Sequence, residues 1–250
     1  MVLKSRNNII SISSGNKAEV GKTWFSVTLS HALSLLGNKV LLFDGDWGLS
    51  NVSLQLGIKP PYDINDVLLN KKALNQIVYV YDNKKLDIIL QKAGSLGLAS
   101  LSVGQMQVLG EDLKLMSKSY NNVILDSATN SENPVHTLSS IASEQIILSS
   151  ADPSSLTEAY ELLRNIRKHL PEKDIKIVIN LTQSLSEGHR AYESLRRASM
   201  EYLNYEPKLL GVIRRDARVR DSIRNKVSII SRYPSSEASL DVMEIAKRLI

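Results

Sequence analysis

The stretch from residue 15 to residue 23 constrains the fold more than any other part of the chain. It reads Gly-Asn-Lys-Ala-Glu-Val-Gly-Lys-Thr, follows the apolar run at 9–13 and leads into a helix-like segment. A loop in this position can cradle a phosphate, because its N–H groups and the positive helix end face the anion together. Gly21 allows close backbone approach, Lys22 can supply a cation to the terminal phosphates, and the Thr23 hydroxyl can ligate Mg²⁺. The sequence therefore predicts a phosphate-binding loop.

Short apolar runs alternate with helix-period segments from end to end. The strand candidates are 9–13, 39–43, 86–90, 122–125, 145–148, 176–179 and 208–213, and the helix candidates are 22–36, 104–119, 154–169, 187–202 and 216–224. Most of the strand candidates are apolar on both faces, which is typical of a parallel sheet covered on both sides. The alternation predicts an α/β fold with a mostly parallel twisted sheet and helices on both faces. With no linker, composition break or repeat, we expect one domain over 1–250.

Composition narrows the class of protein. The chain is 43% hydrophobic and 23% charged, as in ordinary globular domains. It has no cysteine, which excludes disulfides and thiolate metal sites, and its four histidines lack ligand spacing. Residues 1–8 lack the apolar core of a secretion signal and no run reaches transmembrane length, so we expect a cytoplasmic protein. The net charge of +5 shows only that anionic partners are not repelled.

Acidic residues follow two of the predicted strands. Asp44 and Asp46 come after the strand candidate at 39–43, and Asp126 comes after the one at 122–125. Ligands bind at the carboxyl ends of such strands, and a nucleotide with Mg²⁺ needs an acidic group near the metal. We therefore interpret Asp126 as a metal-proximal (Walker B) aspartate and Asp46 as the group that orients the attacking water. The alternative is that Asp44 and Asp126 only cap turns.

Three segments together resemble the MinD/ParA family of deviant Walker ATPases, most closely the flagellar-number regulator FlhG. The first is Lys-Ala-Glu-Val-Gly-Lys-Thr at 17–23, similar to the family's Lys-Gly-Gly-Val-Gly-Lys-Thr. The second, Asp-Gly-Asp-Trp-Gly-Leu-Ser-Asn at 44–51, is the most specific. The third is the downstream series of Asp126-Ser127, the segment 151–160, Asn180 and Asp216. These matches appear in family order over nearly the whole chain.

The resemblance implies a P-loop NTPase fold that binds ATP or ADP with Mg²⁺ and forms a homodimer when loaded with ATP. By carry-over, the catalytic residues are Asp46 and the signature lysine Lys17, which reaches the phosphates of the other subunit. The nucleotide-binding residues are Lys17, Ala18, Glu19, Val20, Gly21, Lys22, Thr23, Trp24 and Asn180, and the metal-binding residues are Thr23, Asp126 and Asp44. The implied function is a nucleotide switch that acts through a regulatory protein partner to place or count an assembly such as flagella or the division site, at the membrane or cell pole.

The chain departs from the family pattern around the predicted site. Asn16 stands in place of a loop glycine, Ala18 and Glu19 replace two more, and Asn130 lies in a second switch that lacks the family's glycine. A carboxylate about 5 Å from the triphosphate would cost about 3 kcal/mol at an effective dielectric near 20, and less if it faces solvent. The sequence thus leaves open a weak ATPase or a pseudo-ATPase scaffold that acts only through protein partners.

Two other segments have competing interpretations. The basic stretch at 214–226, which includes Arg214, Arg218 and Arg224, is either a solvated helix with internal ion pairs or a ParA-like surface for nonspecific DNA binding. The segment 239–250 carries Val242, Ala246 and Leu249 on one face. We expect it to pack on the sheet rather than to anchor the protein to a membrane.

Overall fold

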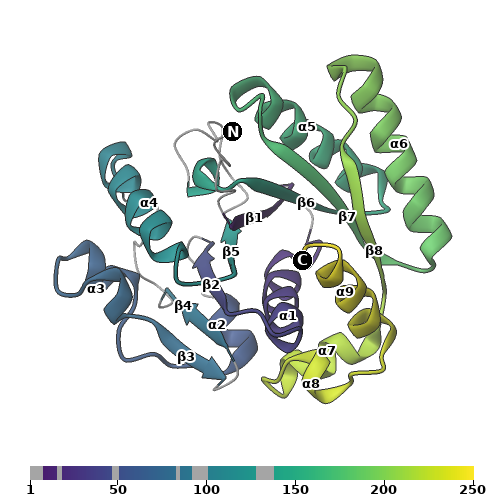
Figure 1. The fold of residues 1–250 in the computed structure, drawn as a ribbon. Coiled ribbons are helices and arrows are strands. Elements are labelled where there is room, and N and C mark those ends of the chain that lie inside the picture. Colours follow the sequence, from purple (N-terminus) through teal and green to yellow (C-terminus); the bar gives the residue numbers. More distant parts are fainter. Residues whose placement is uncertain (1–7, 16–18, 47–50, 83–84, 92–100, 128–137) are drawn as a thin grey trace.

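The computed structural model describes residues 8–15, 19–46, 51–82, 85–91, 101–127 and 138–250. Its strands form one sheet of eight, in the order β3-β4-β2-β5-β1-β6-β7-β8 (Figure 1). The strands are β1 (Ile9–Ser14), β2 (Val40–Gly45), β3 (Tyr79–Asp82), β4 (Leu86–Ile89), β5 (Asn122–Ser127), β6 (Glu144–Ser150), β7 (Asp174–Thr182) and β8 (Lys208–Arg214). Every neighbouring pair is parallel except the antiparallel β3 and β4. The predicted α/β fold with a mostly parallel sheet is confirmed.

All seven predicted strands are present, and β3 is the strand that the prediction missed. It is a four-residue edge strand, Tyr-Val-Tyr-Asp, with Val80 exposed. Such a short alternating run gives little periodicity to recognise, because a strand buried on both faces is what produces the continuous apolar runs seen elsewhere. β3 pairs antiparallel with β4 and forms the edge of the sheet.

The helices follow the predicted alternation, with several short additions. They are α1 (Lys22–Leu35), α2 (Asn51–Leu56), α3 (Ile64–Leu68), α4 (Val103–Ser117), α5 (Pro153–His169), α6 (Leu185–Leu203), α7 (Ala217–Arg224), α8 (Ile229–Arg232) and α9 (Glu237–Lys247), with 3-10 turns η1 (Leu74–Gln76) and η4 (Leu138–Ile141). The helices α2, α3 and α8 have at most six residues, too few for a helical period to show in the sequence. The five longer predicted helices are all present.

The two faces of the sheet are covered by different groups of helices (Figure 1). On one face, α1, α2, α8 and α9 pack with strand residues such as Val40, Ile124 and Val178 into one apolar cluster. On the other face, α4 and η4 pack over β2 and β5, while α5 and α6 pack over β6 and β7. Helices therefore cover both faces, as the two-sided apolar character of the strands predicts.

Helix α1 lies in the middle of the first face and is buried on all sides. Each residue from Lys22 to Ser34 is buried, although the helix contains three serines and two threonines. Thr28 and Ser30 each donate to the carbonyl oxygen four residues earlier, and the Ser26 hydroxyl lies within reach of the Lys22 carbonyl oxygen in the same way. These hydrogen bonds allow a helix with polar side chains to be buried in the core. Burial in turn fixes the position of its first turn, where the predicted site begins.

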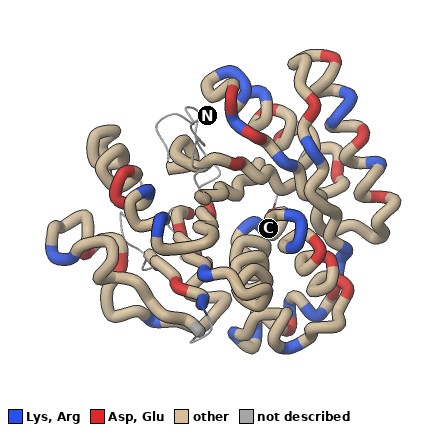
Figure 2. The backbone as a smooth tube through the Cα atoms, in the orientation of Figure 1, with Lys and Arg blue, Asp and Glu red and all other residues tan. Residues whose placement is uncertain are grey.

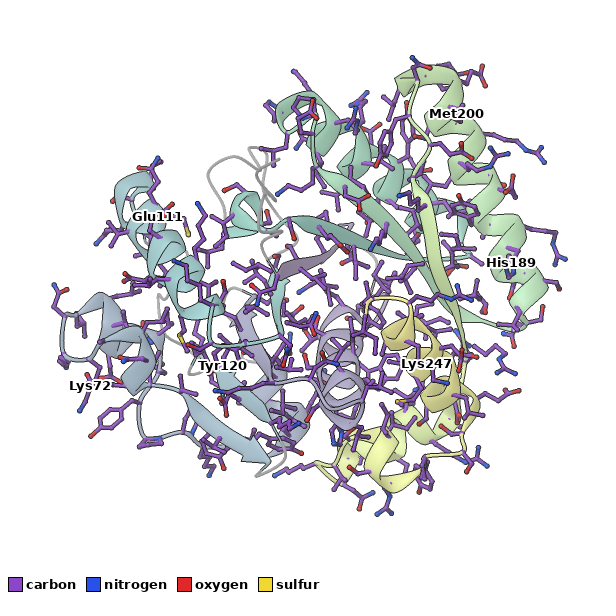
Figure 3. All side chains as sticks on the ribbon, viewed as in Figure 1. Lys72, Glu111, Tyr120, His189, Met200 and Lys247 are labelled. Atoms are coloured by element: carbon purple, nitrogen blue, oxygen red, sulfur yellow. The ribbon has the colours of Figure 1, made fainter. Side chains whose placement is uncertain are left out.

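Helix α9 confirms that the C-terminal segment packs onto the protein. Its residues Val242, Ile245 and Ala246 are buried against α1 and β8, while Lys247 lies on the outer side and pairs with Glu244 at 2.5 Å (Figure 3). The helix begins at Glu237, two residues before the predicted segment. Within the described residues, no helix has the length and apolar character needed to cross a membrane.

Candidate functional site

The second half of the predicted phosphate loop is held in a fixed conformation where it enters α1. Gly21 is the residue before the helix and has φ +80°, in the left-handed region that favours glycine. The Asn180 side chain, at the end of β7, donates from Nδ2 to the Val20 carbonyl oxygen at 2.8 Å. A Cβ on Gly21 would lie 3.1 Å from that same nitrogen. Asn180 is buried here, and in this conformation its amide holds the loop.

Gly15, at the other end of the loop, lies directly under helix α5. A Cβ on this residue would stand 2.3 Å from the Cβ atom of Glu158. Because real Cβ atoms do not approach so closely, the loop can begin here only with glycine. The sequence therefore places a glycine at 15 for packing against α5, while Asn16 occupies the position where the strict pattern has its glycine.

Lys22 joins the two carboxylates that the sequence assigned to water and metal. Its Nζ donates to Asp46 Oδ2 and to Asp126 Oδ1, both at 2.9 Å, and its side chain is 6% exposed. Burial acts to lower the pKa of Lys22, but the charges of Asp126 and Asp46 outweigh it and leave the pKa raised. The ammonium group thus stays charged and bridges the two carboxylates in the described conformation.

Ser26 is a member of this group that the sequence analysis missed. Its Oγ lies 3.0 Å from Asp126 Oδ1 and 3.0 Å from the Lys22 carbonyl oxygen. The signal that could have found it is spacing, because residues four apart on a helix share a face and Ser26 follows Lys22 by four. The face of α1 that carries Lys22 therefore presents two donors to the end of β5.

Asp44 lies beside Asp126 on the neighbouring strand. The two are register partners in the β2–β5 pair and belong to the strands themselves, which corrects the prediction that they follow them. Both side chains are buried. The Asp46 backbone donates a hydrogen bond to Asp44, a contact of the kind that the turn-cap alternative expects. Burial, and then the charge of Asp126, raise the pKa of Asp44 well above its ordinary value.

These two carboxylates suit a divalent cation. Among the described residues, the Oδ2 of Asp126 is buried without a hydrogen-bond partner. Asp44 is buried beside it, and the backbone hydrogen bond from Asp46 only partly offsets the rise of its pKa. Carboxylate oxygens with unmet capacity are the ligands that Mg²⁺ prefers, and the buried Thr23 hydroxyl comes from the adjacent first turn of α1. The described residues hold no cluster of three or more acidic or histidine ligands, so the remaining ligands of a cation here would be phosphate oxygens and water.

The other predicted nucleotide-binding residues divide into three groups. Val20, Thr23 and Trp24 are buried at the start of α1, and the indole nitrogen of Trp24 has no hydrogen-bond partner within the described chain. Glu19 is exposed, which places its carboxylate on the solvent side of the loop, where a repulsive term is smallest. Lys17 and Ala18, together with Asn16, Trp47 and Asn130, lie outside the described residues.

The basic stretch is divided between strand β8 and helix α7, so Arg214 does not share a helix face with the cations of α7. Arg214 ends β8 and is bound to α9, with contacts of 2.8 Å to Asp241 Oδ1 and 2.6 Å to Glu237 Oε1. Arg218 on α7 pairs loosely with Asp216 at 3.8 Å. Four further cations on and around α7 are exposed and have no ion pair among the described residues: Arg215, Arg220, Arg224 and Lys226. Figure 2 shows Lys and Arg along this part of the backbone.

Comparison with known proteins agrees with this fold. Residues 11–229 match the CobQ/CobB/MinD/ParA nucleotide binding domain family. The chain belongs to this family, and the resemblance found in its motifs is confirmed. It is 27% identical to the antiactivator FleN of Pseudomonas aeruginosa over 94% of this chain and 84% of that protein. It is 25% identical to the flagellum site-determining protein YlxH of Helicobacter pylori over 99% of this chain and 83% of that protein.

The structural comparison gives the same fold. The septum site-determining protein MinD of Pyrococcus horikoshii, solved in complex with Mg-ADP, superposes with a TM-score of 0.80 and 22% identity over 97% of this chain and 95% of that one. At this identity the likeness concerns the fold. Together with the family match, it defines the chain as a MinD/ParA nucleotide-binding domain related to FleN, YlxH and MinD.

Proposed function

We propose that this chain is a nucleotide switch that binds ATP with Mg²⁺, dimerises in that state and hydrolyses ATP slowly. The observation that carries the proposal is the position of Lys22, which lies at the start of a buried helix and holds Asp46 and Asp126 through its ammonium group. A cation, two carboxylates and a loop before a helix N-terminus are the parts that phosphoryl transfer requires. The exposed position of Glu19 supports nucleotide binding despite the altered loop.

We propose a role for each residue of the site. In the nucleotide-bound state, the Lys22 ammonium group would turn from the two carboxylates, which it contacts at 2.9 Å, toward the phosphates. Asp126, with Asp44 and Thr23, would then hold Mg²⁺, which neutralises phosphate charge when bound. Asp46, whose side chain is 20% exposed, would orient the attacking water. Nucleotide binding thus exchanges one set of ion pairs for another, which is how the site would sense its ligand.

The output of such a switch is the choice of partner rather than the chemistry itself. A dimer formed only with ATP presents a surface that the monomer lacks, and a partner that binds this surface reads the nucleotide state. The relatedness to FleN, YlxH and MinD supports a role in setting flagellar number or the division site, through a protein partner and near the membrane or cell pole. Lys17 is proposed as the residue that reaches the nucleotide of the second subunit.

A titration with ATP and Mg²⁺, followed by calorimetry for binding and by light scattering for mass, tests this proposal. We expect wild type to bind ATP and double in mass, Lys22→Ala to lose binding, and Lys17→Ala to bind ATP but stay at its original mass. Lys114→Ala is the control, because Lys114 is a surface lysine on α4 whose ion pair in the described structure is with Glu111. Wild type that neither binds ATP nor changes mass would favour the pseudo-ATPase scaffold instead.

A further inference from the structure

Ser26 is placed to control the orientation of Asp126. It is fully buried on α1, and its hydroxyl lies 3.0 Å from Asp126 Oδ1. That hydroxyl has a single proton and two acceptors in reach, the carboxylate and the Lys22 carbonyl oxygen. A hydrogen bond to a charged oxygen is the stronger of the two, so the proton goes to Asp126 when that residue is ionised.

Among the described residues, Asp126 has two hydrogen-bond donors, and they differ in mobility. Lys22 has a long flexible side chain, and the proposed function requires it to leave for the phosphates. Ser26 has a one-carbon side chain on a helix that is buried on every side, so its hydroxyl stays where the backbone places it. Once Lys22 has moved, Ser26 is the donor that still fixes Oδ1 of Asp126. With Oδ1 fixed, the carboxylate of Asp126 cannot rotate freely, and its unpartnered Oδ2 stays in the same orientation.

We infer that Ser26 is a positioning residue for Mg²⁺–nucleotide binding, which holds the Asp126 carboxylate in place through Oδ1 while Oδ2 is left for the metal. This inference rests on the proposed function, because it concerns a metal that accompanies the nucleotide. If the inference is right, replacing Ser26 lowers the affinity for ATP in the presence of Mg²⁺ and leaves the affinity without Mg²⁺ unchanged. A residue that only packed the helix would affect both parts alike.

The chain supplies a matched control in Ser30. It lies one helical turn further along the same buried helix, is equally buried, and donates to the Ser26 carbonyl oxygen at 2.7 Å. Ser30 makes the same kind of backbone contact as Ser26 but, within the described part of the chain, no hydrogen bond to a carboxylate. Replacing either serine by alanine removes the same atom from the same helix, so the two variants separate a loss of packing from a loss of the Asp126 contact.

The experiment measures the affinity for ATP by calorimetry with excess Mg²⁺ and again with EDTA, in wild type, Ser26→Ala, Ser30→Ala and Ser26→Thr. We expect Ser26→Ala to lower affinity about tenfold with Mg²⁺ and less than twofold with EDTA, as loss of a hydrogen bond to a charged group predicts. Ser30→Ala should change neither value by more than about twofold. Ser26→Thr, which retains the hydroxyl, should keep the affinity of wild type.

Each other outcome has a definite meaning. An equal loss with and without Mg²⁺ in Ser26→Ala, or an equal loss in Ser30→Ala, would overturn the role of Ser26 while leaving the proposed switch intact. Wild type that binds ATP equally well with Mg²⁺ and EDTA would also overturn it. Wild type that binds no ATP would reject the proposed function itself, and the two failures are thus distinguishable. Thermal melting of each variant confirms that it is folded.

Discussion

Single residues around the loop show how closely its backbone is packed. Gly15 passes under α5 at a distance that admits no Cβ, and Gly21 takes up a left-handed conformation before α1. Lys22 then follows at once and reaches Asp46 and Asp126. The site therefore depends on the lack of a Cβ atom at Gly15 and Gly21 as much as on its charged side chains.

The packing of Gly15 against Glu158 leads to a prediction about stability. Gly15→Ala would drive a methyl group into the Cβ of Glu158, and we expect it to lower the free energy of unfolding by about 1–3 kcal/mol, as overpacking does. Gly104→Ala is the control, because a Cβ there meets no atom within 4 Å and alanine favours helix α4. Urea unfolding of both variants measures the difference. Equal stability of the two would contradict the packing described at Gly15.

At the scale of elements, α9 is fastened to the end of β8 by Arg214. The backbone N–H and Nε of Arg214 donate to Asp241 Oδ2, while its two terminal nitrogens reach Asp241 Oδ1 and Glu237. This set of bonds raises the pKa of the guanidinium, with the hydrogen bonds to Asp241 as the main cause. It also fixes α9 against α1, the helix that begins the site.

Removal of this contact should affect stability more than removal of an exposed pair. We expect Asp241→Ala to cost about 1.5–3 kcal/mol of unfolding free energy, because it leaves a partly buried arginine without its partner. Glu244→Ala on the same helix removes only an exposed partner of Lys247 and should cost less than about 1 kcal/mol. Unfolding in guanidinium chloride measures the loss for each variant. Similar losses would show that the contact between Arg214 and Asp241 adds nothing to stability.

A second connection between elements makes stability depend on pH. Lys173, before β7, donates to the carbonyl oxygens of Ser139 and Ser140 at 3.2 and 3.0 Å and to that of Ala142, at the end of η4. Burial lowers its pKa to about 8 from the ordinary value of 10.5. Between these two values the unfolded chain binds more protons than the folded one, so this lysine makes stability rise with pH in that window and costs most below about pH 8.

The comparison with Lys173→Met isolates this effect. We expect the unfolding free energy of wild type, relative to Lys173→Met, to increase as pH rises from about 8 to 10.5, because only wild type loses the buried charge. Lys114→Met replaces an exposed lysine and should show no such trend. Urea unfolding at several pH values gives the difference. A flat or falling curve would show that the ammonium group is not penalised by its burial.

For the whole molecule, the question is how charge is distributed over the surface. Lys and Arg lie on and beside α7 and α8 in Figure 2, but Arg232 pairs with Asp221 at 2.8 Å and Arg214 is bound to Asp241 on α9. Within the described basic stretch, four exposed cations without an ion pair remain to contact an anionic partner: Arg215, Arg220, Arg224 and Lys226. This is a small number for binding along a DNA backbone, since affinity of that kind comes from counterions released by many contacts.

We therefore expect weak binding to duplex DNA that depends steeply on salt. Four phosphate contacts predict a loss of affinity of about a hundredfold between 50 and 200 mM salt. Fluorescence anisotropy of labelled DNA measures it, with Arg220→Glu/Arg224→Glu as the variant and Arg164→Glu on α5 as the control. Binding that persists at 200 mM salt would favour the ParA-like reading of the basic stretch. Variants with equal affinity would place any DNA contact elsewhere.

Much of the fold could be read from local patterns. Apolar runs buried on both faces identified seven strands, and the spacing of apolar residues identified the long helices, since both signals arise from how each segment is buried. No such signal marked the short edge strand β3 or the short helices α2, α3 and α8. Each of these elements has six residues or fewer, which is too few to define a period in the sequence.

The chemical groups of the site could be predicted from residue order alone: the loop with Lys22, the aspartates at the strand ends and the order in which they follow each other. Which of these groups contact one another depends on the fold. It joined Lys22 to Asp46 and Asp126, added Ser26, removed Arg214 from the basic surface and placed Glu19 at the solvent. The reason is that residues 100 apart become neighbours only when parallel strands bring their carboxyl ends to one edge of the sheet, and no local pattern encodes that distance.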